Sequence, residues 1–393
     1  MPGDGKIFYI AGAGITGLTL ALSLAKFGAS VVVLERSQSL SEFGAGLQIS
    51  PNARLLLNRL GLDDAISARS IEPTGIDIYP FRRPAPLVTL ELGSIMRERF
   101  GSPYAVMHRA DLADVLFKAA RRFANINMIF GVGSWGAFSD ERGVTVSVAE
   151  ADGQSRTGRA DALIGADGVH SLTRRTLLQG RQARRQGRTA WRTLLPWSSI
   201  EGHLALDRVS VLFGPGFHLV CYPLPHRQQV NLVMFLKNTG AEPLSEPVLP
   251  RSVHKSTHIA ALLAAAENTW TAWPLYTVAA SAWFKGNIGL AGDAAHAMVP
   301  FQAQGAAMGI EDAAVLAPLL VRHGSAAEAF ARYQDIRQSR VNRVRRISEM
   351  NGHIFHMEGP FRLARDLAIS LQGSQGHIRR LSWLYAHDAG VVP

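Results

Sequence analysis

The chain opens with a pattern that few folds can accommodate. Three closely spaced glycines separate two apolar stretches, and an acid closes the second stretch. Lys6–Ala11 predicts a buried strand, Ile15–Phe27 a helix and Ser30–Glu35 a second strand. Together they form a βαβ unit of about 30 residues, the usual size of that motif. We therefore expect a parallel sheet covered by helices, and hence an α/β fold.

The glycine turn has the composition of a dinucleotide-binding site. Gly12 permits the tight turn, Gly14 lets a pyrophosphate approach the backbone, and Gly17 lets the helix pack closely on the strand. The helix start, at Ile15 and Thr16, offers free N–H groups and a partial positive charge to phosphates. The expected ligand is a cofactor that carries a pyrophosphate.

The acid at the end of the second strand supports the same interpretation. Glu35 follows the last glycine at close to the spacing of about 20 residues that such sites use. Its carboxylate would accept hydrogen bonds from the ribose hydroxyls of an adenosine. We include the next residue, Arg36, in the predicted site. This motif alone does not distinguish NAD from FAD.

Length and composition bound the class of protein. The 393 residues suggest about two to three domains. The only cysteine, Cys221, excludes an internal disulfide and metal clusters held by several thiolates, and it favours a cytoplasmic location. The uncharged run Ile7–Ala25 resembles the apolar region of a signal peptide, but glycines interrupt it. We therefore expect no membrane span.

The net charge of +10 does not by itself indicate which kind of partner the chain binds. The arginines of residues 180–188 lack interleaved aromatic residues, which predicts a solvated loop and no nucleic-acid partner. His254 and His258 have the spacing of a helical metal site, but no acidic residue completes a ligand set, so no metal is expected. A serine hydrolase is excluded because the chain has no Gly-x-Ser-x-Gly segment.

The pattern of strands and helices predicts two interleaved domains. Short strands dominate from Thr189 to Leu236, whereas helices are predicted near residues 304–321 and 328–350. The expected division has three parts: a discontinuous cofactor domain, a β-rich substrate domain and a C-terminal helical segment. The cofactor domain comprises residues 1–72, 100–180 and 275–345. The substrate domain comprises residues 73–99 and 181–274, and the C-terminal helical segment comprises residues 346–393.

Two later motifs identify a family by resemblance. The segment Asp161-Ala-Leu-Ile-Gly-Ala-Asp167-Gly168-Val-His-Ser171-Leu-Thr-Arg174 resembles the DG motif of FAD-dependent aromatic hydroxylases, the group A flavoprotein monooxygenases. The segment Gly289-Leu-Ala-Gly292-Asp293-Ala-Ala-His296-Ala-Met-Val-Pro300 resembles their GD motif. Residues 44–52, 108–112 and 383–385 fit the branch of salicylate hydroxylase, 3-hydroxybenzoate 6-hydroxylase and 6-hydroxynicotinate 3-monooxygenase. The similarity covers nearly the whole chain.

The resemblance implies a fold and an activity. The fold is a Rossmann-like FAD-binding domain of the glutathione-reductase type, interleaved with a β-sheet-rich substrate domain and followed by C-terminal helices. The activity is that of a single-component monooxygenase, monomeric or homodimeric. It holds FAD tightly, uses NAD(P)H transiently with NADH favoured, and activates O₂ as a flavin C4a-hydroperoxide. The substrate is a small aromatic molecule, either phenolic or a hydroxylated N-heteroaromatic, and often bears a carboxylate.

The resemblance also assigns further residues to FAD. Asp293 would bond the ribityl hydroxyls, and Arg109 would lie against the ribityl–phosphate chain. A helix that begins near Gln304 and Gly305 would direct N–H groups at the N1–C2=O edge of the flavin, where negative charge accumulates on reduction. Relatives carry Gly-Gln-Gly where this chain has Ala303-Gln304-Gly305. The remaining residues assigned to FAD are Gln48, Asp167, Gly292, Pro300 and Ala306.

The substrate site is expected on the β-rich part. His218, Val220 and Tyr222 alternate along a strand and so share one face. The resemblance suggests His218 as the base that takes a phenol proton and Tyr222 as a hydrogen-bond donor to the substrate. A half-buried structural His–Tyr pair explains the same pattern. The predicted pocket residues are Gln48, Val220, Met234 and Pro300.

Other activities remain compatible with these motifs. A flavin oxidase or dehydrogenase of the same fold would use the same cofactor without inserting oxygen. A flavin halogenase is disfavoured because no Trp-x-Trp-x-Ile-Pro segment is present. A non-catalytic regulator that binds flavin or nucleic acid is the alternative from a different class.

Overall fold

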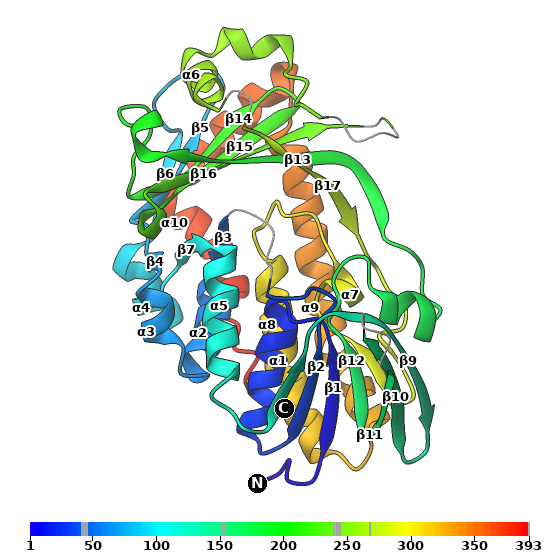
Figure 1. The fold of residues 1–393 in the computed structure, drawn as a ribbon. Coiled ribbons are helices and arrows are strands. Elements are labelled where there is room, and N and C mark those ends of the chain that lie inside the picture. Colours follow the sequence, from blue (N-terminus) through cyan, green and yellow to red (C-terminus); the bar gives the residue numbers. More distant parts are fainter. Residues whose placement is uncertain (41–45, 151–154, 239, 241–244, 267–268, 392–393) are drawn as a thin grey trace.

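The structure is a computed structural model of the chain. It describes residues 1–393 except 41–45, 151–154, 239, 241–244, 267–268 and 392–393. Gly44 and Ala45, which begin one of the family segments, therefore lie outside the described residues. A parallel sheet with its helices forms one half of the molecule, and a larger sheet lies across the other half (Figure 1).

The first half is built on a six-stranded sheet of order β18-β19-β12-β1-β2-β8. All neighbours pair in parallel except the edge strand β18. These strands come from apolar runs that are nearly continuous, as expected for a sheet buried on both faces. Their bounds are β1 Ile7–Ala11, β2 Ser30–Leu34, β8 Ile126–Ile129, β12 Ala162–Gly165, β18 Phe284–Lys285 and β19 Ile288–Leu290.

The parallel order explains why distant motifs meet. The strands β1 and β2 end immediately before the glycine turn and Glu35, and β12 and β19 end two residues before the Asp-Gly of the DG motif and the Gly-Asp of the GD motif, with one residue between them in each case. Since carboxyl ends of parallel strands share one edge, these segments converge where α/β sheets bind ligands. Helices α1 and α8 pack together against the sheet, and α5 lies beside α1. The helices of this half are α1 Ile15–Lys26, α2 Pro51–Arg59, α3 Asp63–Ser67, α5 Arg109–Ala120, α7 Asp293–His296 and α8 Gly305–Arg322.

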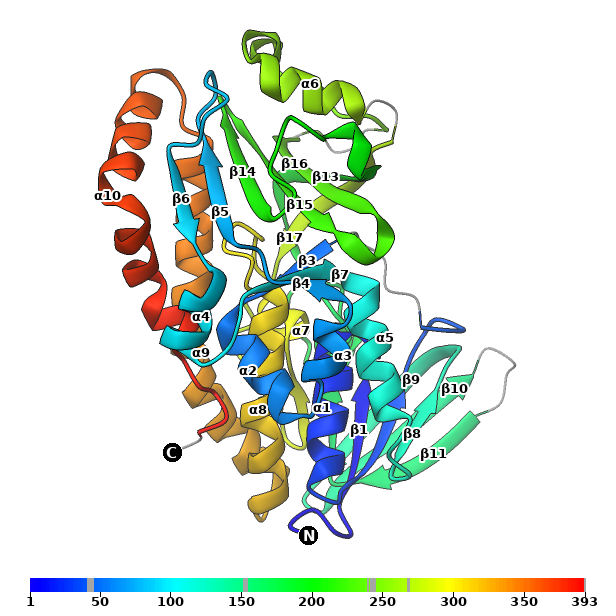
Figure 2. The same cartoon turned by 90° about the vertical axis from the view of Figure 1, so that its left-hand side faces the viewer.

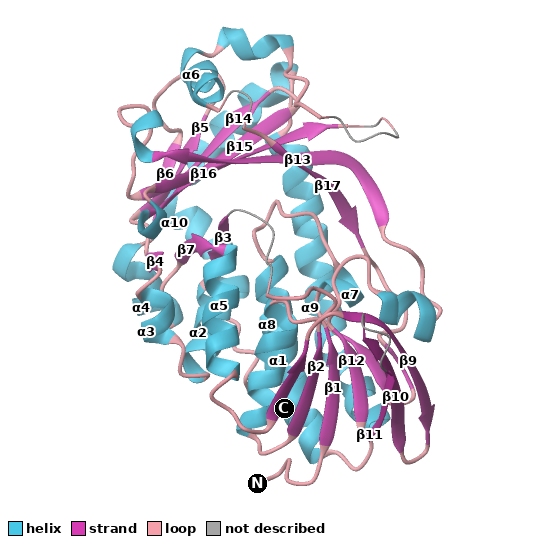
Figure 3. Cartoon of the chain, in the orientation of Figure 1, coloured by secondary structure: helices cyan, strands magenta, loops and turns pink. Residues whose placement is uncertain are grey.

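Two small antiparallel sheets flank this half. One, of order β11-β10-β9, extends the side that carries β12, and Trp135 on β9 reaches back to Thr173. The other, of order β3-β7-β4, lies between α5 and the larger sheet (Figure 3). The bounds are β9 Val132–Asp140, β10 Gly143–Glu150, β11 Ser155–Ala160, β3 Gly46–Ile49, β4 Ser70–Ile71 and β7 Ala105–His108.

The larger sheet has seven strands in the order β17-β13-β16-β15-β14-β5-β6. Residues predicted as a basic loop at 180–188 partly belong to it, because β13 begins at Arg184 and a bulge separates Arg185 from Thr189. That part of the loop prediction is wrong, since pairing with β17 overrides the polar composition of the segment. The bounds are β5 Gly75–Tyr79, β6 Val88–Glu91, β13 Arg184–Pro196, β14 Arg208–Gly214, β15 Phe217–Leu224, β16 Gln229–Lys237 and β17 Thr271–Thr277.

The two faces of the larger sheet have different neighbours. One face packs with α6 Thr257–Ala265 in an apolar core that includes Trp191, Leu232 and Met234. The opposite face turns toward the parallel sheet. The helix α4 Gly93–Phe100 follows β6 and returns the chain to β7.

Two long helices complete the fold. Helix α9, Ala326–Phe355, runs from the parallel sheet to the larger sheet (Figure 1). Helix α10, Gly359–Tyr385, lies along β6 and bends at Gly373 (Figure 2). The predicted α/β fold class with C-terminal helices is confirmed. Among the described residues, none of the helices combines the length and the apolarity that crossing a membrane requires.

Candidate cofactor and substrate site

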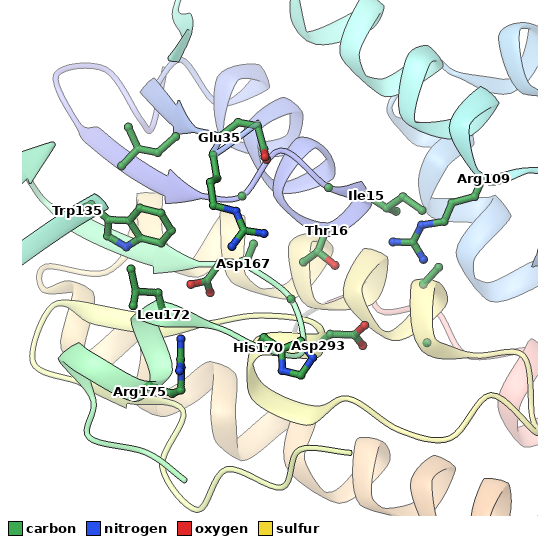
Figure 4. Close-up of a pocket in the computed structure, with 18 of the residues that line it drawn as sticks. Ile15, Thr16, Glu35, Arg109, Trp135, Asp167, His170, Leu172, Arg175 and Asp293 are labelled. Atoms are coloured by element: carbon green, nitrogen blue, oxygen red, sulfur yellow. The ribbon is translucent and has the colours of Figure 1, made fainter. Parts of the chain in front are cut away.

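A cavity of about 390 Å³ opens at the carboxyl edge of the parallel sheet. Glu35 and Trp135 lie toward one end of it, Arg109 lies at the other end, and Thr16 and Asp293 lie between them (Figure 4). The predicted site residues that line it are Gly12, Gly14, Ile15, Thr16, Glu35, Arg36, Arg109, Asp167, Asp293, Gly305 and Ala306. The structure therefore brings together residues from the glycine turn, the DG motif, the GD motif and the start of α8.

Two helices direct uncapped N-termini at this cavity. Gly14 precedes α1 and Gln304 precedes α8, and neither N-cap position supplies a side-chain hydrogen bond to its helix. The first N–H groups of a helix have no intrahelical partner and carry a partial positive charge. Gly14, Gly305 and Ala306 all line the cavity. The cavity therefore offers N–H donors and partial positive charge at two separate points, which suit anionic or electron-rich groups.

The glycine turn has the backbone conformation and the close contacts that its sequence predicts. Gly12 has φ +106°, a conformation that residues with a Cβ rarely adopt. A Cβ on Gly17 would lie 1.9 Å from the carbonyl oxygen of Gly12. Gly17 itself does not line the cavity, so its role is to let α1 approach the turn.

Glu35 is held in place by backbone donors. Its Oε2 accepts a hydrogen bond from the N–H of Ala13 at 2.9 Å, and its Oε1 accepts one from the N–H of Ser37 at 2.9 Å. These bonds fix the carboxylate at the cavity wall beside Arg36, and each oxygen keeps a further lone pair for a ligand hydroxyl.

The DG motif forms a tight, self-bonded turn. Asp167 accepts hydrogen bonds from the hydroxyl of Ser171 and from the N–H of Thr173 at 2.9 Å. Arg174 is 1% exposed and donates to the carbonyl oxygens of Ala294 at 2.7 Å and Val169 at 2.7 Å. Arg174 therefore ties the DG turn to the GD motif, and it is Arg175 that lines the cavity.

The GD motif is anchored by a buried acid on α8. Asp312 accepts a hydrogen bond from the N–H of Gly292 at 2.8 Å and shares one with His296 Nε2 at 2.6 Å. Gly292 has φ +60°, and a Cβ there would lie 2.5 Å from Oγ1 of Thr16. Gly292 thus allows the GD motif to approach α1 closely, and this contact places Asp293 at the cavity.

A network of buried charges lies behind this anchor. Arg337 on α9 donates to Glu311 at 2.5 Å and to Asp312 at 2.8 Å, and all three side chains are at most 1% exposed. Arg340 adds two bonds to Glu311 at 2.7 Å each. Burial raises the pKa of both carboxyls, but the arginines, and His296 for Asp312, lower each pKa below its ordinary value overall. Both acids are therefore held ionised.

Several predicted residues lie beside the cavity without lining it. The side chain of Gln304 turns away and donates to the hydroxyl of Ser50 at 2.8 Å. Gln48 on β3 accepts a hydrogen bond from the hydroxyl of Tyr104. The predicted cofactor residues absent from the cavity lining are Gly17, Gln48, Gly292, Pro300 and Gln304.

Sequence reasoning missed other residues of the cavity. Trp135 comes from β9, which no motif marks. His170 lies within the DG segment and Arg175 directly follows it, so their closeness to Asp167 in sequence was a usable signal. Among the residues that the structure describes, no three His, Cys, Asp or Glu side chains gather as a set of metal ligands.

His218 lies in an aromatic cluster on the face of the larger sheet that turns toward the parallel sheet. Its ring stacks on Phe235 with centroids 4.5 Å apart, and its Nδ1 is 2.6 Å from Nε2 of His356, the residue that follows α9. Phe301 and Phe355 cover its other sides. Burial, with the nearby charge of Arg188, lowers the pKa of His218 to about 3. These features favour the structural alternative over the role of a proton acceptor.

The other predicted substrate residues divide between the two faces. Tyr222 shares the face of His218 and packs against Gly46, where a Cβ would lie 2.4 Å from the ring. Val220 lies between these two residues. Met234 pairs with Leu219 and lies in the core under α6. The prediction of Met234 as a pocket residue is therefore wrong, because strand alternation turns it to the opposite face.

The geometry defines a dinucleotide-binding α/β protein with a second sheet above its cofactor cavity. Residues 6–348 match the family model described as FAD binding domain. The chain is 34% identical over 98% of its length to a 3-amino-4-hydroxybenzoate 2-monooxygenase of Streptomyces platensis, 96% of which is covered. It is 32% identical over 96% of its length to a 3-hydroxybenzoate 6-hydroxylase of Klebsiella oxytoca, 95% of which is covered.

Solved structures show the same fold. A salicylate hydroxylase substrate complex is 24% identical with a TM-score of 0.76, and the match covers 99% of this chain and 97% of that one. Klebsiella pneumoniae HpxO complexed with FAD and uric acid is 22% identical with a TM-score of 0.82, covering 98% of this chain and 97% of that one. The chain belongs to the family of FAD-dependent aromatic hydroxylases, and its cofactor is FAD.

The cavity fits this cofactor. FAD has a pyrophosphate, which suits a helix N-terminus, and a ribose, which suits a fixed carboxylate. The uncapped start of α1 and the oriented Glu35 provide both features in one continuous cavity.

Proposed function

We propose that the chain is a single-component monooxygenase that uses FAD, NAD(P)H and O₂ to hydroxylate a small aromatic molecule. The observation that carries this proposal is the continuous cavity that runs from Glu35 to the start of α8. The relatives named as hydroxybenzoate monooxygenases, matched over nearly their whole length, support the same class of substrate.

The lining residues are assigned to parts of FAD. Glu35 and Arg36 bind the adenosine end, and the N-terminus of α1 with Gly14 and Ile15 binds the pyrophosphate. Asp293 bonds the ribityl hydroxyls. The N-terminus of α8, at Gly305 and Ala306, faces the flavin, and Arg109 and Asp167 flank the chain between them. When bound, FAD accepts electrons from NAD(P)H and activates O₂ for transfer to the substrate.

The substrate is assigned to the space between the flavin end of the cavity and the larger sheet. Val220 and Tyr222 face this space, and the tyrosine hydroxyl orients the aromatic ring. His218, with its low pKa and its bond to His356, supports the aromatic cluster that closes the site instead of taking a proton. An apolar enclosure of this kind excludes water from the reacting atoms.

The decisive experiment is a screen of phenols, aromatic acids and hydroxypyridines with the FAD-loaded protein. NADH and NADPH oxidation should rise with one class of compound, and the product should gain one oxygen atom, labelled when ¹⁸O₂ is supplied. Oxidised product without that oxygen would replace the proposal with an oxidase or dehydrogenase. Bound FAD with no turnover on any aromatic compound would point to a non-catalytic flavoprotein.

A further inference from the structure

The chain segment that leads into α8 is held by one face of α9. We call residues 300–303 the entry turn, because they lie just before Gln304, which precedes the first residue of α8. Ser348, Asn351 and Gly352 are spaced three and four residues apart on α9, so they lie on the same side of that helix. All three contact the entry turn or the residue before it.

Two polar side chains of α9 bind this segment. Ser348 is fully buried, and its hydroxyl donates to the carbonyl oxygen of Val299 at 2.5 Å. Nδ2 of Asn351 donates to the carbonyl oxygen of Phe301 at 3.1 Å and to Oε1 of Gln302 at 2.6 Å. Because a carbonyl oxygen can only accept, the bond to Phe301 fixes which end of the Asn351 amide faces the turn.

Packing brings the helix close to the same turn. A Cβ on Gly352 would lie 2.7 Å from the ring of Phe301, so α9 reaches this distance only because the position has no side chain. The Phe301 ring is 7% exposed and also meets the ring of His356, which follows the helix. The entry turn is therefore bound by α9 through its backbone and through its aromatic side chain.

The entry turn ends in a conformation that costs free energy. Ala303 has φ +53°, in the left-handed region that residues with a Cβ rarely adopt. Its N–H donates to the carbonyl oxygen of Pro300 at 3.0 Å, which closes the turn around Phe301 and Gln302. Strain of this kind persists only where surrounding contacts hold it. Asn351 binds both central residues of the turn, so its hydrogen bonds offset that cost.

The turn determines where α8 begins. Only Gln304 separates Ala303 from Gly305, the first residue of the helix. Gly305 and Ala306 line the cofactor cavity, and the first N–H groups of a helix have no intrahelical partner. A helix start stabilises negative charge, and the reduced flavin carries more negative charge than the oxidised one. A displacement of this helix start therefore changes the relative affinity for the two forms.

We propose that Asn351 is a positioning residue that sets the reduction potential of the bound flavin. It acts through the entry turn, which keeps the N-terminus of α8 directed at the flavin. Ser348 supports the same segment through Val299. The inference rests on the proposed function, which assigns the flavin to the start of α8, and it adds a residue outside the cavity lining to those that control the cofactor.

The test is the midpoint reduction potential of the FAD-loaded protein, measured without any aromatic substrate. Asn351→Leu keeps the approximate size of the side chain but removes both hydrogen bonds. Its affinity for reduced FAD should fall about tenfold relative to oxidised FAD, which lowers the potential by about 30 mV for a two-electron couple. Asn342→Leu, the same substitution elsewhere on α9, is the control and should leave the potential unchanged.

Two further variants separate positioning from a general loss of packing. Ala303→Gly, added to Asn351→Leu, removes the Cβ that makes the left-handed conformation costly, so the turn can keep its shape without the bonds from Asn351. The double variant should return the ratio of the two affinities to within about threefold of the wild type. Ser348→Ala removes one bond and should lower the potential by less, and it carries the test if Asn351→Leu does not fold.

Ala306→Asp reports whether the flavin lies at the start of α8, because it adds a negative charge at a residue that lines the cavity. It should lower the potential at least as much as Asn351→Leu does. A response in Ala306→Asp but not in Asn351→Leu or Ser348→Ala would overturn the role of Asn351 and leave the proposed function standing. No response in any variant would contradict the assignment of the flavin as well.

The double variant and the oxygen assay complete the comparison. If Ala303→Gly does not restore the potential, Asn351 does not act through the entry turn and the proposal is overturned. If the potentials respond as expected but no aromatic compound gains oxygen, the positioning role stands and the proposed activity fails.

Discussion

Replacing Arg337 with methionine removes the centre of the charge network behind the GD motif. The variant replaces the unbranched stem of the side chain with an apolar one but leaves Glu311 and Asp312, both fully buried, without their shared cation. Breaking a buried ion pair on one side costs about 3–5 kcal/mol. The lower end of that range applies, because Glu311 keeps Arg340 and Asp312 keeps the N–H of Gly292. Against a typical total stability of about 5–15 kcal/mol, this loss is large.

The loss should depend on pH in a defined direction. In the wild type the pKa of Asp312 and that of Glu311 are below their ordinary values, so both carboxylates stabilise the fold at neutral pH. This stabilisation disappears only as the pH falls through the folded-state values. In Arg337→Met both pKa values rise toward their ordinary values, because burial is then opposed only by Arg340 and Asn52 at Glu311 and by His296 at Asp312. The loss of stability relative to the wild type is therefore full at neutral pH and shrinks as the pH falls into the ordinary range of these carboxyls.

The assay is urea unfolding at fixed FAD concentration, at about pH 7 and about pH 4, with Arg332→Met as the control. Arg332 is exposed on the same helix, and its replacement should change stability by less than about 0.5 kcal/mol. Arg337→Met should be about 3 kcal/mol less stable than the wild type at the higher pH and closer to it at the lower pH. A loss below about 1 kcal/mol, or an equal loss at both pH values, would refute the reasoning.

Three further predictions concern the cofactor turn and the aromatic cluster. In Gly17→Ala the new Cβ meets the carbonyl oxygen of Gly12, so the purified protein should contain less FAD than Gly324→Ala, where a Cβ meets nothing within 4 Å; equal flavin content would count against it. Glu35→Gln loses its charge toward the ribose hydroxyls and should weaken FAD binding about tenfold or more, measured by fluorescence on dilution; unchanged affinity would remove Glu35 from the site. His218 has a folded pKa of about 3 against an ordinary 6.5, so the unfolded chain binds the extra proton and stability falls as the pH drops below 6.5. His218→Gln should reduce that slope by up to about 1.4 kcal/mol per pH unit, seen in urea unfolding between about pH 6.5 and pH 5, and an identical slope would contradict the assignment.

The fold was predictable where sequence patterns are local. The βαβ unit around Gly12 and the helix that begins near Gln304 follow from apolar periodicity and glycine spacing, and both occur within a residue or two of the expected bounds. The basic segment from Arg184 was predicted as a loop because its strand character comes from pairing with β17, a contact about 90 residues away. Tertiary pairing of this kind leaves no local signature.

The site was predictable only in part, for a similar reason. Strand alternation correctly groups His218 with Tyr222, but it does not reveal that α9 brings His356 onto the histidine. Met234 was misplaced because the side of the sheet that it faces depends on the register of β16.

Helix α9 connects the two halves of the molecule and fixes the distance between them. Its 30 residues span about 45 Å. Arg337 and Arg340, near the middle of the helix, bind the acids of α8, and Phe355 at its end and the adjoining His356 contact His218. Deleting or inserting one residue between these two sets of contacts would rotate one set relative to the other by about 100° about the helix axis. The exposed side chains of this helix can therefore vary in evolution. A change in the number of its residues, in contrast, would break the contacts with one of the two halves.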